Sequence, residues 1–193
     1  GRETDPCASA ANVCAFDSHD SHDGAIASIG QNNGPSGGGK YEISHGVPDG
    51  AYFFASMDGA GFYAPGNYDF SAVYVAGVKD KDNIFGHASY DSIQKAIGQG
   101  GTYDVQRSQG VFYGAYTNAS NFNVGIYMNG AGYTLYQTKA IGAVYSRRNS
   151  SNANSASQTQ WWVRGWQSAQ AKNFPHGRPA AASDFIFSNQ GTH

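Results

Sequence analysis

A repeated period of two in hydrophobicity, between residues 122 and 166, constrains this chain more than any other feature. Apolar residues alternate with polar or small ones from 123 to 128, Asn129-Gly130 interrupts the pattern, and the alternation resumes from 133 to 137. Because successive side chains of a strand point to opposite faces, this pattern predicts a hairpin. Asn-Gly readily takes the positive φ that a tight hairpin turn requires.

Residues 140–145 and 159–166 predict a second strand pair, which a polar loop from Arg147 to Ser157 would join. Other short apolar runs are bounded by Gly, Pro, Asn and Asp, which favour turns. These runs predict strands at 25–29, 41–43, 51–57, 61–64, 68–78, 101–106, 111–117 and 184–187.

One stretch, residues 89–99, favours a helix. Ser89 or Asp91 would be its N-cap, and Gly98 or Gly100 would end it. We therefore expect an all-β fold, an antiparallel β-sandwich or jelly-roll-like domain with about nine or ten strands and one short helix.

The composition supports this fold class and divides the chain in two. Only 13% of the residues are charged, whereas Gly (26) and Tyr (13) are abundant, a bias against the charged surfaces of most helices. Residues 1–50 contain few apolar side chains and predict a loop-rich N-terminal arm, which would lie along a sheet edge or reach a neighbouring molecule. Residues 51–193 would form a single β-sandwich domain.

Charge and cysteine usage restrict the environment and the partners. A net charge of −2 provides no long-range attraction to nucleic acid or to anionic lipid, and no apolar run approaches the ~20 residues of a membrane span. Cys7 and Cys14 enclose a short loop and would form a disulfide in an exported protein. We therefore expect a secreted protein, extracellular or on a virion surface.

A short acidic and histidine-rich segment near the N-terminus is the candidate metal site. Oxygen and nitrogen ligands at this density can hold a divalent cation, although the segment equally suits a solvated loop. Its candidate ligands are His19, Asp20, His22 and Asp23. The sequence indicates no other cofactor.

Catalytic signatures are weak in this chain. There is no Gly-x-Ser-x-Gly nucleophile elbow and no phosphate-binding loop. A polysaccharide hydrolase or lyase would need paired carboxylates and a general base. The candidates are Asp58 with Asp69, Asp104 with Asp184, and the bases His87 and His176. We expect no catalysis and keep this enzyme class as an alternative.

Aromatic residues in the second half provide the best functional signal. On one strand, the adjacent Trp161 and Trp162 would point to opposite faces, which predicts that one of them is exposed or covered by a loop. Exposed rings beside amides and guanidinium groups suit a sugar or a protein interface, although tyrosine-rich strands also pack with their hydroxyls at the rim. The candidate ligand-binding residues are Tyr133, Tyr136, Arg147, Arg148, Asn152, Trp161, Trp162 and Trp166.

A segment in the middle of the chain resembles the distal tips of tailed-phage fibres and shufflon-type adhesins. The resemblance comprises Arg107–Tyr113, Tyr116-Thr117-Asn118 and the alternating residues Asn123–Met128, with Gly114-Ala115-Tyr116 between the tyrosine and the Thr-Asn pair. It implies a β-rich tip that forms a homo-oligomer and binds a cell-surface glycan or protein receptor. It implies no catalytic residue.

These observations predict a receptor-binding or carbohydrate-binding adhesin module that acts through exposed aromatics and a polar hairpin loop. Two alternatives come from other classes of protein. One is a structural subunit of a pilus or fibre assembled through its N-terminal arm. The other is the secreted polysaccharide hydrolase or lyase that uses Asp and His.

Overall fold

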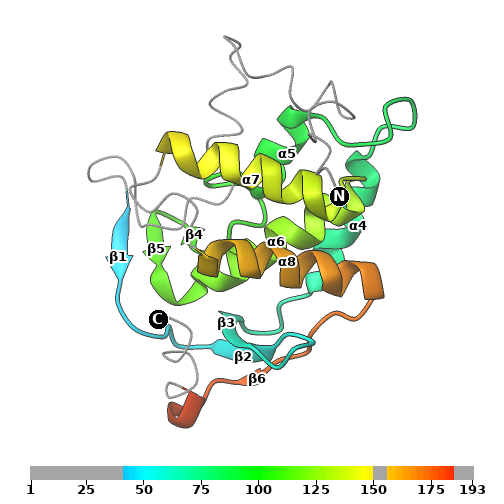
Figure 1. The fold of residues 1–193 in the computed structure, drawn as a ribbon. Coiled ribbons are helices and arrows are strands. Elements are labelled where there is room, and N and C mark those ends of the chain that lie inside the picture. Colours follow the sequence, from blue (N-terminus) through cyan, green and yellow to red (C-terminus); the bar gives the residue numbers. More distant parts are fainter. Residues whose placement is uncertain (1–40, 150–155, 185–193) are drawn as a thin grey trace.

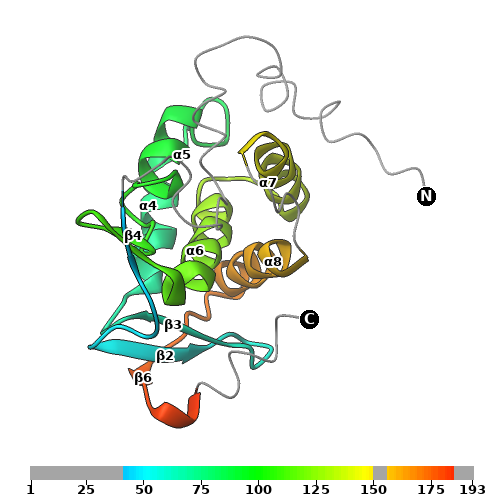
Figure 2. The same cartoon turned by 90° about the vertical axis from the view of Figure 1, so that its left-hand side faces the viewer.

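The structure, a computed structural model, describes residues 41–149 and 156–184. This part of the chain contains five α-helices and six short strands in two small sheets. The predicted all-β sandwich or jelly-roll of nine or ten strands is therefore wrong. Figures 1 and 2 show the helices as the body of the molecule, with one sheet across its lower end and the other at its side.

The lower sheet has the strand order β3-β2-β6. Strands β2 (Ala51–Ala55) and β3 (Gly61–Pro65) form an antiparallel hairpin, which confirms the strands predicted there. Gly59 in the connection has φ +85°, a conformation that glycine adopts without steric cost. Strand β6 (Arg178–Pro179) pairs antiparallel with Tyr52–Phe53, so the C-terminal segment closes the sheet.

The side sheet has the order β1-β5-β4. Strand β1 (Glu42–Ser44) runs parallel to β5 (Val111–Tyr113), and β4 (Arg107–Ser108) is antiparallel to β5. The strand predicted at 101–106 is wrong, because turns occupy this stretch. The strand predicted at 111–117 ends at Tyr113, where the 3-10 helix η1 (Gly114–Tyr116) begins.

Helix α5 (Tyr90–Ile97) confirms the one helix predicted from the sequence. The Ser89 side chain caps it by accepting a hydrogen bond from the amide of Ser92 at 3.2 Å, and Gly98 is the C-cap. Its buried residues are Tyr90, Ile93, Ala96 and Ile97, which is the spacing of one helical face.

Helix α4 (Phe70–Asp80) occupies a stretch predicted to be a strand. Asp69 caps the helix by accepting from the amide of Ser71, a local signal for a helix start. Phe70, Val73 and Gly77 are its buried residues, a spacing of three and four. The alternation of apolar and small residues here matches both periods, and the cap together with tertiary packing selects the helix.

Helix α6 (Thr117–Gly130) is the central helix, and it contradicts the first strand of the predicted hairpin. Both alternating sets are buried, since Asn123 and Tyr127 are as inaccessible as Ile126. A helix that is enclosed on nearly all sides shows no polar face, so its sequence lacks the usual helical period. Asn129-Gly130 is the last part of α6 rather than a hairpin turn.

Helices α7 (Leu135–Asn149) and α8 (Ala156–Ala171) replace the other predicted strands of this region. Helix α6 packs against α4 and α8, and α8 also contacts α7. The α6–α8 crossing depends on glycine, because a Cβ on Gly125 would lie 2.0 Å from the carbonyl oxygen of Trp162. A Cβ on Gly165 would lie 2.0 Å from the carbonyl oxygen of Phe122.

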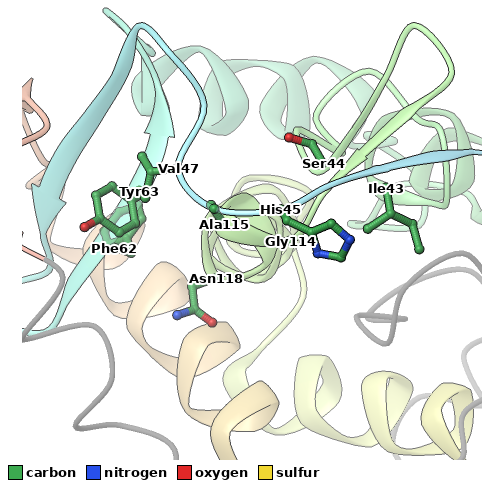
Figure 3. A pocket seen from close by; sticks show the side chains of 10 residues that line it. Ile43, Ser44, His45, Val47, Phe62, Tyr63, Gly114, Ala115 and Asn118 are labelled. Carbon is green, nitrogen blue, oxygen red and sulfur yellow. The ribbon is translucent and has the colours of Figure 1, made fainter.

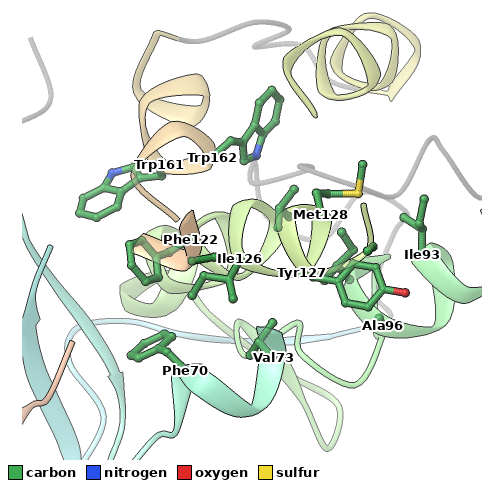
Figure 4. Packing of buried hydrophobic residues seen from close by; sticks show 14 of the residues in the cluster. Phe70, Val73, Ile93, Ala96, Phe122, Ile126, Tyr127, Met128, Trp161 and Trp162 are labelled. Atoms are coloured by element: carbon green, nitrogen blue, oxygen red, sulfur yellow. The ribbon is translucent and has the colours of Figure 1, made fainter. Parts of the chain in front are cut away.

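An aromatic cluster joins the lower sheet to the helices, and Figure 4 shows its helical members Phe70, Phe122 and Trp161. The Phe62 ring centroid lies 5.0 Å from that of Phe122 and 5.2 Å from that of Trp161, while Phe54 and Phe70 are 5.1 Å apart. Edge-to-face and tilted pairs of this kind contribute about 0.5–1.5 kcal/mol each beyond their burial. The cluster therefore fixes how the sheet sits on α4, α6 and α8.

A buried polar network fastens the 98–113 segment to α6. Asp104 accepts from the Arg107 guanidinium and from the Gly100 amide, both at 2.9 Å, and from the Ser120 hydroxyl at 3.1 Å. The Asp104 and Arg107 side chains are only 4% and 2% exposed. Such a pair is costly to break, because removing one partner leaves a buried charge.

Some predictions fall outside the described residues. These are the Cys7–Cys14 disulfide, the strand at 25–29 and the candidate metal ligands His19, Asp20, His22 and Asp23. The strand predicted at 184–187 is described only at Asp184, which belongs to the 3-10 helix η2 (Ala182–Asp184).

Candidate functional site

A concavity of the described chain lies between β2, the start of α4 and the segment that runs from α8 to β6. It has a volume of about 560 Å³, within the usual range for small-molecule sites. Strand β2 contributes Tyr52 and Phe54, and the other lining residues are 67–71 and 172–177. We name this concavity the Tyr52 cleft.

The β3–α4 connection forms one wall of the Tyr52 cleft. Asn67 takes φ +56° at the end of a Pro-Gly-Asn turn, a conformation that asparagine tolerates better than most residues. The Tyr68 amide closes the turn on the Pro65 carbonyl at 3.2 Å. The Tyr68 hydroxyl accepts from the buried amide of Asn123 at 2.8 Å, and burial raises its pKa. The wall is thereby attached to the central helix.

Asp69 places a fixed negative charge in the cleft. Its carboxylate accepts from the Ser71 amide at 3.0 Å and from the Ser71 hydroxyl. These bonds outweigh a small desolvation effect and, with the nearby His176, hold the Asp69 pKa below its ordinary 3.8. The carboxylate is therefore ionised at neutral pH and available as an acceptor.

The opposite wall begins where α8 ends. The Asn173 amide donates to the Ser168 carbonyl at 3.0 Å and the Lys172 amide to that of Ala169 at 3.1 Å, the pattern of a Schellman cap. Lys172 occupies the position usually filled by glycine, with φ +52°. Its ammonium group lies 4.0 Å from the Tyr74 ring centroid and donates to the Ala169 carbonyl.

The end of this wall, from Gly177 onward, packs closely against the lower sheet. A Cβ on Gly177 would lie 2.6 Å from the Phe54 ring, so glycine is needed for the chain to pass there. Beyond it, the Arg178 guanidinium binds both carboxylate oxygens of Asp184, which is only 2% exposed. Arg178 also lies over the Phe53 ring at 5.1 Å. The wall is thus anchored at both ends.

Backbone strain is concentrated at this cleft. Among the described residues, the non-glycine positions with positive φ are Asn67, Gln109 and Lys172, and two of the three line the Tyr52 cleft. Such conformations cost on the order of 1–3 kcal/mol each and gather at ligand-binding positions. Exposed Asn173 and His176 extend the polar lining beside them.

A second concavity lies between the β1–β2 connection and the start of α6 (Figure 3). It has a volume of about 320 Å³ and is lined by Ser44, His45, Tyr63 and Asn118 among others. A third, of about 420 Å³, shares Val47 and Tyr63 with it. Neither brings together a carboxylate, an ammonium group and an imidazole, as the Tyr52 cleft does.

Two of the three tryptophans predicted to bind ligand, Trp161 and Trp162, lie in the core, whereas Trp166 is half-buried. Trp161 and Trp162 are 5% and 1% exposed. They are adjacent on the helix α8 rather than on a strand, and both sides of α8 on which they lie are covered by other elements. Trp161 packs on the sheet side against Phe62, whereas the Trp162 Nε1 donates to Asn121 Oδ1 at 2.9 Å (Figure 4). Neither ring offers a face to a sugar.

The remaining predicted ligand-binding residues do not form one described site. Tyr133 is buried and its hydroxyl donates to the Ala88 carbonyl at 2.6 Å, while Trp166 Nε1 donates to the Tyr133 carbonyl at 3.0 Å. Tyr136 is 42% exposed on α7. The backbone of Arg147 and Arg148 belongs to α7 rather than to the predicted loop, and Asn152 lies outside the described residues.

Three of the four predicted carboxylates, those of Asp58, Asp104 and Asp184, pair with arginines. Asp58 accepts from Arg164 Nε at 2.9 Å, and hydrogen bonds from Ser56 and Arg164 lower its pKa despite partial desolvation. Asp104 and Asp184 each pair with an arginine within their own loop. His87 stacks against Tyr133, with its Nδ1 3.3 Å from the tyrosine hydroxyl. Of the candidate acids and bases, only Asp69 and His176 share a cleft.

Several residues that line the Tyr52 cleft were not predicted as functional residues from the sequence. Tyr52, Asn67 and Asn173 belong to a strand, a turn and a helix cap, and no motif links them. The usable signal was the Pro-Gly-Asn turn followed by a capping aspartate two residues before a serine. Read together, these residues indicate a helix start with a polar surface.

Comparison with known proteins identifies no relative. No protein family, curated protein or solved structure significantly matches this chain. Among the described residues, no helix combines the length and apolarity that crossing a membrane requires.

Proposed function

We propose that this protein is a carbohydrate-binding module that holds a cell-surface glycan in the Tyr52 cleft. The observation that carries the proposal is the lining itself, in which Tyr52, Tyr68 and Phe174 stand beside amide, carboxylate and imidazole groups. Sugar rings offer C–H faces to aromatic surfaces and hydroxyls to polar groups. A lining of this composition suits both parts of a sugar.

The charges in the cleft favour a neutral ligand. Asp69 is negative, and Lys172 is positive but already occupied by the Tyr74 ring and the Ala169 carbonyl. The cleft therefore has no large excess of either sign. Sugar hydroxyls can donate to the Asp69 carboxylate and exchange hydrogen bonds with Asn67 and Asn173.

The state of Asp69 supports binding rather than catalysis. A general acid works best when its pKa lies near the operating pH, whereas the pKa of Asp69 lies below 3.8. The Asp69 carboxylate is also the N-cap of α4, where it accepts a hydrogen bond from the Ser71 amide. Asp69 thus serves as a fixed hydrogen-bond acceptor. A secreted or virion-surface location follows as part of the same proposal.

A glycan array screen of the purified protein, followed by calorimetry on the best ligand, tests this proposal. His176→Ala and Asn173→Ala each remove a polar group from the cleft without disturbing a buried residue. We expect each to weaken Kd by about three- to tenfold, the effect of one lost hydrogen bond.

The matched control is His45→Ala, which removes an exposed imidazole from the second concavity. We expect it to leave the glycan affinity unchanged. If the protein binds no glycan, the proposed function is wrong. If His45→Ala weakens binding and His176→Ala does not, the glycan lies in the second concavity instead.

A further inference from the structure

The connection between α4 and α5 is a short hairpin that projects from the helical body (Figure 1). Lys81 and Ala88 form an antiparallel bridge at its base. The Asp82 carboxylate accepts from the amides of Ile84 at 2.6 Å and Phe85 at 3.0 Å. The Gly86 amide donates to the Asp82 carbonyl at 2.8 Å. These bonds fix the backbone at the tip, Ile84–Phe85.

The base of the hairpin is also fastened to the body. The Ala88 amide donates to the Ala131 carbonyl at 2.9 Å, and the Tyr133 hydroxyl donates to the Ala88 carbonyl. Gly132 has φ +93°, and a Cβ there would lie 2.1 Å from the Gly86 carbonyl oxygen. The tip is therefore held at a defined place by the connection between α6 and α7.

The residues at this fixed tip are the most exposed large apolar side chains of the described chain. Ile84 is 87% exposed and Phe85 is 63% exposed. Single exposed apolar residues are common on protein surfaces. Two adjacent ones on a rigid projection are different, because ordering the backbone in advance lowers the cost of inserting them into a partner.

The four charges at the base of the hairpin, on Lys79, Asp80, Lys81 and Asp82, sum to zero, and both carboxylates are engaged within the protein. The Asp82 carboxylate is turned to the backbone amides of the hairpin, and Asp80 accepts from the Tyr127 hydroxyl at 2.7 Å. Lys79 and Lys81 are exposed, and within the described residues neither forms an ion pair. The cations are thus free to contact an external anionic surface beside the apolar tip.

We propose that the Ile84–Phe85 tip inserts into the interface of a lipid bilayer that contains anionic headgroups. Lys79 and Lys81 would contact the headgroups, as basic residues near such surfaces do. A stable protein interface usually needs about 800 Å² from each partner, and the residues that flank this tip, Asn83 and Gly86, are polar or small. A bilayer can accept two apolar side chains and leave that polar base in water.

Sedimentation of the full chain with lipid vesicles tests the proposal. We expect partitioning onto vesicles of phosphatidylcholine mixed with phosphatidylserine, and less onto phosphatidylcholine alone. Replacing both Ile84→Ser and Phe85→Ser should reduce the partition coefficient by about a hundredfold, because two apolar side chains no longer leave water. Replacing Lys79→Gln and Lys81→Gln should reduce it by about tenfold or more on mixed vesicles.

The matched control is Met57→Ser, which removes a half-exposed apolar residue from the β2–β3 connection and should change nothing. Circular dichroism of each variant checks that the fold is retained. The proposal is overturned if the wild type stays in the supernatant with mixed vesicles. It is also overturned if the tip variant sediments like the wild type, or if Met57→Ser reduces partitioning equally. Capture of a protein through the tip, without vesicle binding, overturns it too.

Discussion

The α6–α8 crossing and the Tyr52 cleft differ in what restricts their residues. At the crossing, Gly125 and Gly165 bring two backbones so close that a methyl group would overlap a carbonyl oxygen. In the cleft, Asn173 and His176 are exposed and line an open concavity. At the crossing, the available volume restricts which residues fit, whereas in the cleft the polar groups of the side chains matter. Substitutions should therefore separate stability from binding.

The largest effect is expected at the buried network that fastens the 98–113 segment to α6. Asp104→Ala leaves the Arg107 guanidinium buried without its carboxylate, which should lower the free energy of unfolding by about 3–5 kcal/mol. Urea unfolding followed by circular dichroism measures this loss. Asp91→Ala breaks an exposed pair with Lys95 and serves as the control, with little expected change. Equal losses in both variants would contradict the role of burial.

The next effect concerns the crossing itself. Gly165→Ala places a methyl group 2.0 Å from the Phe122 carbonyl oxygen, so α6 and α8 must move apart. We expect a loss of about 3 kcal/mol, the upper part of the range for overpacking. Gly114→Ala is the matched control, because a Cβ there meets nothing within 4 Å. A neutral Gly165→Ala would show that the crossing adjusts easily.

Trp162→Phe distinguishes the core from the cleft directly. The change leaves the buried Asn121 Oδ1 without the indole donor and should cost about 2 kcal/mol of stability. Because Trp162 is remote from the Tyr52 cleft lining, glycan affinity at a temperature where the variant is folded should equal that of the wild type. Calorimetry checks the affinity. Weaker glycan binding by the folded variant would indicate that Trp162 takes part in binding and would contradict this prediction.

The smallest effect is at the cleft wall. Asp69→Ala removes the cap of α4 and should cost about 1 kcal/mol at neutral pH. The pKa of Asp69 is lower in the folded chain than its ordinary 3.8. Its stabilising contribution is therefore present above pH 3.8 and is lost as the pH falls below that value through the folded-state pKa.

Thermal unfolding measured at decreasing pH checks this. The difference between the wild type and Asp69→Ala should shrink as the pH falls through and below 3.8. Asp69→Asn is the matched variant, because asparagine caps helices comparably but does not titrate. A constant difference between wild type and Asp69→Ala at all pH values would contradict the assigned role of the carboxylate.

Local signals in the sequence were reliable where a polar cap or turn accompanied them. Ser89 is the N-cap and Gly98 the C-cap of α5, as predicted. The Asp58-Gly59 turn joins β2 and β3, which were also predicted as strands. Their physical basis is local, since caps and turns satisfy backbone hydrogen bonds within a few residues. Asp69 is an equally local cap signal for α4, whereas the alternation from Phe70 to Ala76 predicts a strand there.

The candidate site was less predictable than the hairpin or α5. The sequence predicts Asp69 as a candidate carboxylate and His176 as a candidate base, and nothing in their spacing places them in one cleft. That juxtaposition requires α8 to return the chain to β2, where Gly177 passes over Phe54. A contact across more than a hundred residues depends on the packing of the whole helical body.

By itself, the sequence determined the β2–β3 hairpin, α5 and an abundance of aromatic and small residues for a dense core. Only the tertiary structure decided that α6 is a helix, because Asn123, Gly125 and Tyr127 suit an outward strand face equally well until their neighbours are known. Enclosure by α4, α8 and the lower sheet removes the polar face that would have revealed a helical period. The same enclosure buries Trp161 and Trp162, whereas Asn173 and His176 of the Tyr52 cleft remain exposed.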